Sequence, residues 1–194
     1  MFLVRISSYN QTIGEKTKEI KSAHLFEIPH AKNVVDLFLN IELILSEIPD
    51  SEKTELHYPV ADYLVKTTNT NWTGKQFTFQ GVVPFDIDEC DYGRVEEYID
   101  AFCSVVHGSR TKVGIVKSGH GLQFVVKDSK GIGSLEDLNI LKDSYVAVCE
   151  KISNSLLIAG LPGKVDINVF RDKATLRLPL SYRADNGYHV GVVG

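Results

Sequence analysis

A chain of 194 residues, 43% of them hydrophobic, can bury a substantial core and is most simply one domain, or one domain with an N-terminal extension. Its composition is that of an ordinary soluble globular protein. A net charge of −4 argues against a protein that binds nucleic acid over its whole surface, but it is compatible with a local basic groove.

The cysteines and the N-terminus indicate the compartment. Cys90, Cys103 and Cys149 are odd in number and widely spaced, with no C-x-x-C pair. We therefore expect core or boundary thiols in a reducing compartment, not a disulfide framework or a zinc knuckle. The chain starts without an apolar run behind basic residues, which argues against a signal peptide. The longest apolar stretch, residues 34–48, is too short to cross a bilayer, so we expect a cytoplasmic protein without a membrane partner.

The first 75 residues predict an N-terminal α/β extension packed on a core. Residues 2–6 resemble a short strand, 10–30 are too mixed to assign, and 31–48 predict a helix that ends at Pro49. Residues 51–74 are irregular in pattern, with a short helix around 59–64. The polar run 67–75 is typical of a loop, and Trp72 in it either covers a site or packs.

Residues 76–194 carry a sharper pattern and form the predicted core. Gln76 begins an alternating stretch that becomes an apolar strand up to Asp88, and residues 94–106 have helical spacing closed by His107. Two β-rich runs, 112–117 and 122–127, flank a Ser-Gly-His-Gly hairpin turn. A long helix follows a capping box of Ser134 and Asp137. Its predicted buried face consists of Leu138, Leu141, Tyr145, Cys149, Ile152 and Leu156. Strands are expected at 165–170 and 174–179.

This order is β-α-β-β-α-β with an added hairpin, so the predicted class is α+β with a ferredoxin-like or RRM-like core. In that arrangement the first strand lies between the third and the fourth. Asp86 and Asp88 are two apart and point to one face of the first strand, and Asp166 near the fourth would lie beside them. Hard cations such as Mg²⁺ prefer oxygen ligands, so three converging carboxylates suit a divalent metal. Glu89 and Asp91 are expected to cap the turn that follows.

Three segments together resemble the motifs of the archaeo-eukaryotic primase superfamily, with spacing most like that of primase-polymerases. FDID is similar to the acidic first motif, KSGHGLQFVV to the second, and DINVFRDKATLRLPLSYR to the third. The resemblance spans residues 79–183. It implies a primase fold and a template-dependent nucleotidyltransferase that joins nucleoside triphosphates on single-stranded DNA. Phages, plasmids and other mobile elements often carry such domains with a helicase, which would place the protein in a host-cell cytoplasm.

The resemblance also assigns roles to residues. Asp86, Asp88 and Asp166 match the catalytic carboxylates that hold one or two Mg²⁺ or Mn²⁺ ions, with Asp172 as a competitor for the third position. Arg177 matches the triphosphate-binding arginine, whose planar fork suits phosphate oxygens. Arg183 matches a later basic position.

The second motif fits the family in two registers. Ser118-Gly119-His120 reads as Ser-x-His, but Gln123 occupies the place just before the strand where the family usually has histidine. We favour Gln123 in that role, with Ser118 and the backbone amides of 119–121 cradling phosphate and His120 nearby. Lys117 either faces the triphosphate or simply ends a strand.

Two other classes stay open. A non-catalytic single-stranded nucleic-acid-binding module can use an RRM-like sheet, but it usually displays aromatic residues where this strand carries carboxylates. A metal-dependent nuclease also uses acidic clusters, but it has less use for Arg177 and a glycine-rich phosphate turn.

Overall fold

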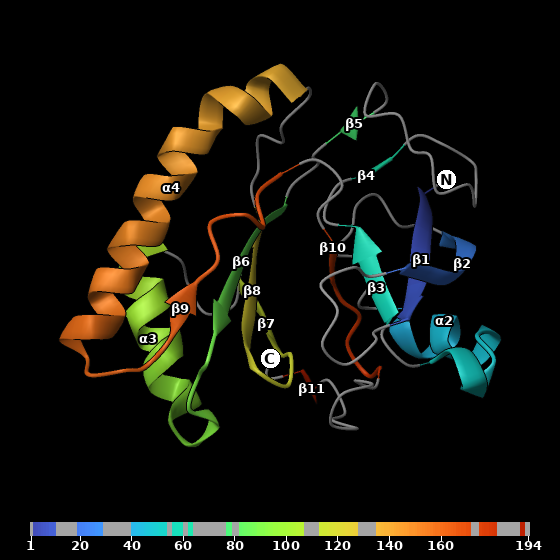
Figure 1. The fold of residues 1–194 in the computed structure, drawn as a ribbon, viewed down its shortest axis with the longest axis horizontal. Helices are drawn as coiled ribbons and strands as arrows, with labels where there is room; N and C mark the ends of the chain where they lie inside the picture. Colours follow the sequence, from blue (N-terminus) through green and yellow to red (C-terminus); the bar gives the residue numbers. More distant parts are fainter. Residues whose placement is uncertain are drawn as a thin grey trace.

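The computed structural model describes residues 2–10, 19–28, 40–53, 56–59, 62–63, 77–78, 82–106, 113–127, 135–171, 175–181 and 191–192 (Figure 1). The strands are β1 (Phe2–Asn10), β2 (Glu19–Ile28), β3 (Leu56–Pro59), β4 (Asp62–Tyr63), β5 (Phe77–Thr78), β6 (Val82–Asp88), β7 (Val113–Lys117), β8 (Gly121–Lys127), β9 (Lys164–Val165), β10 (Thr175–Arg177) and β11 (Gly191–Val192). The helices are α2 (Ile41–Glu47), α3 (Val95–Val106) and α4 (Leu135–Ile158), with 3₁₀ turns η1 (Asp50–Glu52) and η3 (Tyr92–Arg94).

The larger sheet has five strands in the order β11-β7-β8-β6-β9, and each neighbouring pair is antiparallel. Along the chain, β6, α3, β7, β8, α4 and β9 follow one another, so the first strand of this series lies between the third and the fourth. Those are the neighbours that the sequence predicted for it. The predicted α+β class is confirmed.

A second sheet has four strands in the order β10-β3-β1-β2. Its strand β10 comes from the far end of the chain and pairs with β3, which places Arg177 opposite His57. The sequence predicted a strand near 174–179 but gave it no partner in the N-terminal part. The short helix expected around 59–64 is wrong, because β3 ends at Pro59 and residues 62–63 form β4.

One part of the core lies between α3, α4 and one face of the five-stranded sheet. Buried side chains of the four-stranded sheet and α2, such as Ile6, Leu56 and Ile44, belong to the same core. Four aromatic side chains from α3, α4 and the sheet pack in a row. Phe102 and Phe124 stack with ring centroids 4.2 Å apart, Phe85 and Tyr145 stack at 5.1 Å, and Phe85 meets Phe102 edge-on at 5.2 Å. Of the predicted buried face of α4, all members are buried except Leu141, which is 41% exposed. In Figure 1 the five-stranded sheet lies between these helices on the left and the four-stranded sheet with α2 on the right.

Several expectations are corrected or fall outside the described residues. The strand expected over 165–170 ends at Val165, because the chain turns at 167–168. The predicted helix over 31–48 is described only from Ile41. The other expectations lie outside the described residues, namely those for Trp72, His107, Ser134, Asp172 and Arg183. No helix in the described part is both long and apolar enough to cross a membrane.

Candidate active site

The end of β6 presents two carboxylates on the face of the sheet that the helices do not cover. Phe85 and Ile87 are buried in the helix-covered core. Because successive side chains of a strand point to opposite faces, Asp86 and Asp88 lie on the other face. That face is directed to the side where the four-stranded sheet lies (Figure 1).

Asp166 is brought beside this pair by the register of β9. Ile87 is opposite Val165 and Asp88 is opposite Lys164, so the same antiparallel register, continued by one residue, places Asp166 opposite Asp86. The Asp166 amide donates a 2.8 Å hydrogen bond to the Asp86 carbonyl. The three carboxylates that the sequence singled out, from positions 80 residues apart, therefore share one edge of the sheet.

Asp166 also ends its own strand. Its Oδ1 accepts hydrogen bonds from the Asn168 amide at 2.8 Å and the Asn168 side-chain nitrogen at 3.1 Å. An aspartate that binds the backbone two residues on forms an Asx turn, which explains why the strand predicted over 165–170 stops here. One carboxylate oxygen of Asp166 is thus committed to the turn.

Burial and neighbouring charges raise the pKa of two of the carboxyl groups at this edge. Burial, followed by the neighbouring charges of Asp88 and Asp166, raises the pKa of Asp86 to about 7, although a hydrogen bond from Gln123 and the charge of Arg177 act against the rise. Burial, then Asp166 and Glu89, raise the pKa of Asp88, opposed by His120 and Lys164. Crowded carboxylates of this kind favour a bound cation or proton.

Gln123 lies directly across from Asp86 on β8 and is 4% exposed. Among the described residues, neither its Oε1 nor Asp86 Oδ1, both buried, has a hydrogen-bond partner. A buried acceptor without a donor costs about 1–3 kcal/mol. Each of these two oxygens can therefore accept a further donor or a cation. His120 is exposed in the hairpin turn near Asp88.

The turn between β7 and β8 is closed by its own polar groups. The Ser118 amide and hydroxyl both donate to the Gly121 carbonyl, at 2.8 and 3.1 Å. The Gly119 amide donates to the Tyr92 hydroxyl at 2.7 Å, and that hydroxyl donates to the Gly121 carbonyl at 2.9 Å. Ser118 and the Gly119 amide, both expected to cradle phosphate, are thus already engaged within the protein.

Tyr92 was missed by the sequence reasoning, because nothing in its local pattern marks a residue that braces a turn 27 positions away. Lys117 Nζ lies 5.5 Å from the centre of the Tyr92 ring, close enough for a cation–π contact. Lys117, at the end of β7, therefore packs over the Tyr92 ring. Asp91 fulfils its predicted capping role, since its side chain accepts a 2.9 Å hydrogen bond from the Gly93 amide.

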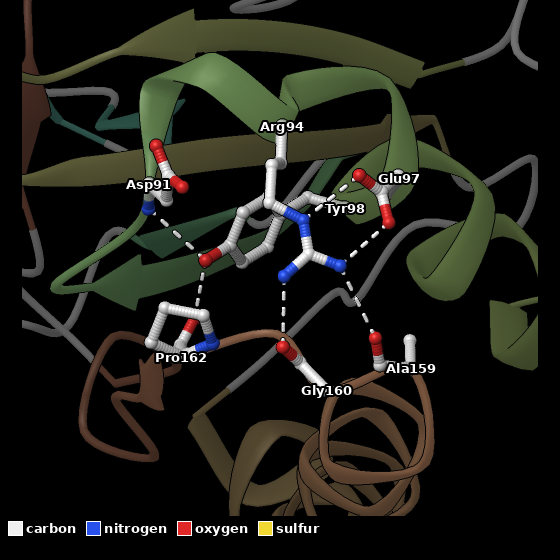
Figure 2. A network of polar contacts seen from close by, with 7 residues as sticks. All are labelled: Asp91, Arg94, Glu97, Tyr98, Ala159, Gly160 and Pro162. Carbon is white, nitrogen blue, oxygen red and sulfur yellow. Dashed lines mark hydrogen bonds and ion pairs between the residues drawn. The ribbon is translucent and has the colours of Figure 1, made fainter.

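A polar network holds the loop before Asp166 against the turn after Asp88 (Figure 2). Arg94 donates to the Gly160 carbonyl at 2.8 Å and the Ala159 carbonyl at 3.3 Å while it binds Glu97. Tyr98 donates to the Pro162 carbonyl and accepts a 3.0 Å hydrogen bond from the Asp91 amide. The segment leading to Asp166 is therefore fixed relative to the segment that follows Asp86 and Asp88.

Arg177 reaches the same edge from the other sheet. It is 7% exposed on β10, and its charge lowers the pKa of Asp86. The site thus combines three acidic groups from the five-stranded sheet with a buried cation from the four-stranded sheet.

The described residues contain no group of three His, Cys, Asp or Glu side chains already arranged to hold a metal ion. The donor chemistry nevertheless fits a hard divalent cation, because Asp86 Oδ1 and Gln123 Oε1 are buried acceptors without donors among those residues. One oxygen of Asp166 is held by its turn.

Comparison with known proteins identifies a fold. No family model and no curated protein sequence matches the chain. A solved structure described as the polymerase domain from Mycobacterium tuberculosis Ligase D, in complex with DNA, is similar to this chain with a TM-score of 0.53 and 11% identity. The similarity covers 95% of this chain and 70% of that one. The chain therefore has an α+β fold similar to that of a polymerase domain.

Proposed function

We propose that this chain is a template-dependent nucleotidyltransferase of the primase-polymerase type, with an RRM-like catalytic core of the archaeo-eukaryotic primase superfamily. Its substrates are nucleoside triphosphates, its template is single-stranded DNA, and a helicase domain or subunit is its expected partner. The observation that carries the proposal is the meeting of Asp86, Asp88 and Asp166 at one sheet edge, with Arg177 in electrostatic reach of Asp86. The likeness in fold to a polymerase domain that was solved with DNA supports it.

The carboxylates have the role of holding Mg²⁺ or Mn²⁺, which supplies charge stabilisation at the attacked phosphate and the leaving pyrophosphate. Asp86 contributes its buried free oxygen, Asp88 its partly exposed carboxylate, and Asp166 the oxygen that its turn leaves available. Burial, followed by the repulsion of neighbouring carboxylates, raises the pKa values of Asp86 and Asp88, so their charged forms are disfavoured without a cation. The cost of assembling them is a reason to expect a functional role.

Arg177 binds the triphosphate of the incoming nucleotide. A guanidinium offers a planar fork to two phosphate oxygens, and burial keeps water from competing with them. Gln123 orients Asp86 through its side-chain hydrogen bond. The turn at Ser118–Gly121 and the exposed His120 near Asp88 would contact the entering phosphates. Lys117 and Arg183 are the remaining proposed contacts.

The test is nucleotide incorporation with purified protein, Mn²⁺ or Mg²⁺, labelled nucleoside triphosphates and a single-stranded template. We expect new or extended oligomers from the wild type. The Asp86→Asn variant should lose at least about 100-fold in rate, because several kcal/mol of charge stabilisation depend on the metal. Asp143→Asn, which changes an exposed aspartate on α4, is the matched control and should retain the wild-type rate.

The same reaction separates the other two classes. A shortened template would indicate a metal-dependent nuclease. Template binding without any new or shortened product would indicate a non-catalytic single-stranded nucleic-acid-binding module. Either result would overturn the proposal.

A further inference from the structure

The four-stranded sheet places a second nitrogen-bearing side chain next to Arg177. In the antiparallel pairing of β10 with β3, Arg177 lies directly opposite His57. Directly opposed residues share a face of the sheet, with Cβ atoms about 4.5–5.5 Å apart. Both are largely buried, His57 at 5% exposure and Arg177 at 7%.

The face that these residues share is the one directed at the carboxylates. Their neighbours along the strands, Leu56 and Leu176, alternate to the opposite face and belong to the apolar core. Burial and the charges of Asp88 and Asp166 raise the pKa of Asp86, and the positive charge of Arg177 opposes that rise, so the two side chains lie within electrostatic reach of each other. His57 therefore occupies the side of the N-terminal sheet from which Arg177 acts.

Apolar packing does not explain why a histidine occupies this buried position opposite an arginine. A neutral imidazole has one N–H to donate. An anion that binds the guanidinium can accept this N–H as well. A polyphosphate chain carries several anionic oxygens in a row and can engage both donors at once.

We propose that His57 is a phosphate-binding residue, and that it forms with Arg177 a subsite on the N-terminal sheet for the polyphosphate tail of the nucleotide. The inference rests on the proposed function, since it places the triphosphate at Arg177. It assigns the N-terminal region a direct part in substrate binding.

The experiment measures the affinity of the full chain for inorganic tripolyphosphate, a nucleoside triphosphate and the corresponding nucleoside. Two variants of similar volume separate hydrogen bonding from packing: His57→Gln keeps a side-chain donor and His57→Leu does not. His57→Leu should weaken binding of tripolyphosphate and triphosphate by about 10-fold to 100-fold and leave nucleoside binding unchanged. His57→Gln should bind within a fewfold of wild type. The melting temperature of each variant checks that it is folded.

Arg177→Leu distinguishes failure of the inference from failure of the proposed function. If Arg177→Leu weakens triphosphate binding and a folded His57→Leu does not, His57 is structural and the inference is wrong, while the proposed function stands. Equal losses in His57→Gln and His57→Leu would also contradict it, because a side-chain donor at this position would then make no difference. If the wild type binds no polyphosphate, both the inference and the proposed function fall.

Discussion

Gly121 tests the packing that holds the site together. A methyl group built on it would lie 2.0 Å from the Ile87 carbonyl oxygen, 2.8 Å from the Ile87 carbonyl carbon and 2.9 Å from Asp88 Cα. All three are main-chain atoms of β6, the strand paired with β8, so no side chain can rotate away. A relaxed contact needs about 3.5 Å, so Gly121→Ala must push the strands apart by roughly 1 Å or more.

We expect this substitution to destabilise the protein by about 3 kcal/mol, because overpacking and stretched ladder hydrogen bonds act together. In a chain of this size that corresponds to a fall in melting temperature of about 6–12 °C. Thermal and denaturant unfolding followed by circular dichroism measure it.

The matched control is Gly114→Ala on β7 of the same sheet. A Cβ there would meet only Val125 Cβ and the Val125 carbonyl oxygen, both at an ordinary 3.8 Å. We expect no loss, and a gain of about 0.5–1 kcal/mol is consistent with replacing glycine in a strand. If Gly121→Ala and Gly114→Ala melted at the same temperature, the close approach of β8 to β6 at Asp88 would be refuted.

Three more predictions concern the supports of the site. Tyr98→Phe should lower the free energy of unfolding by about 1–3 kcal/mol, since the Pro162 carbonyl and Asp91 amide lose their partner, and an unchanged denaturation midpoint would contradict the network. Tyr92→Phe removes the hydroxyl that bridges the two glycines of the turn and should cost about 1 kcal/mol, with faster amide exchange at that turn as the specific readout. Burial raises the pKa of the Cys149 thiol to about 11, so at pH 8 it should resist alkylation until the protein unfolds; rapid labelling of Cys149 in the native state, read by mass spectrometry, would be inconsistent with this.

Elements with a strong local signal were predictable from the sequence. The helical spacing of α3 and α4 and the glycine-rich turn between β7 and β8 gave those elements to within a few residues. The connectivity of the predicted elements then placed β6 between its neighbours, and with it the carboxylate of Asp166 beside Asp86. The prediction that Leu141 is buried was wrong, because an apolar residue at the margin of a helical face can stay exposed.

The pairing of β3 with β10 was the part that the sequence did not predict. Strand β3 is four residues long and β10 is three, and neither carries a clear alternation. Their pairing joins segments more than a hundred positions apart, so no local preference indicates that His57 meets Arg177. The strand expected over 165–170 failed for a local reason, because the Asp166 side chain binds the Asn168 amide and starts a turn.

The most direct test of the central claim is anomalous diffraction from crystals of the protein soaked with Mn²⁺ and a non-hydrolysable nucleoside triphosphate. The account predicts a manganese peak among Asp86, Asp88 and Asp166, with the triphosphate extending to Arg177. A fully occupied triphosphate bound elsewhere, or manganese bound away from these three carboxylates, would contradict it.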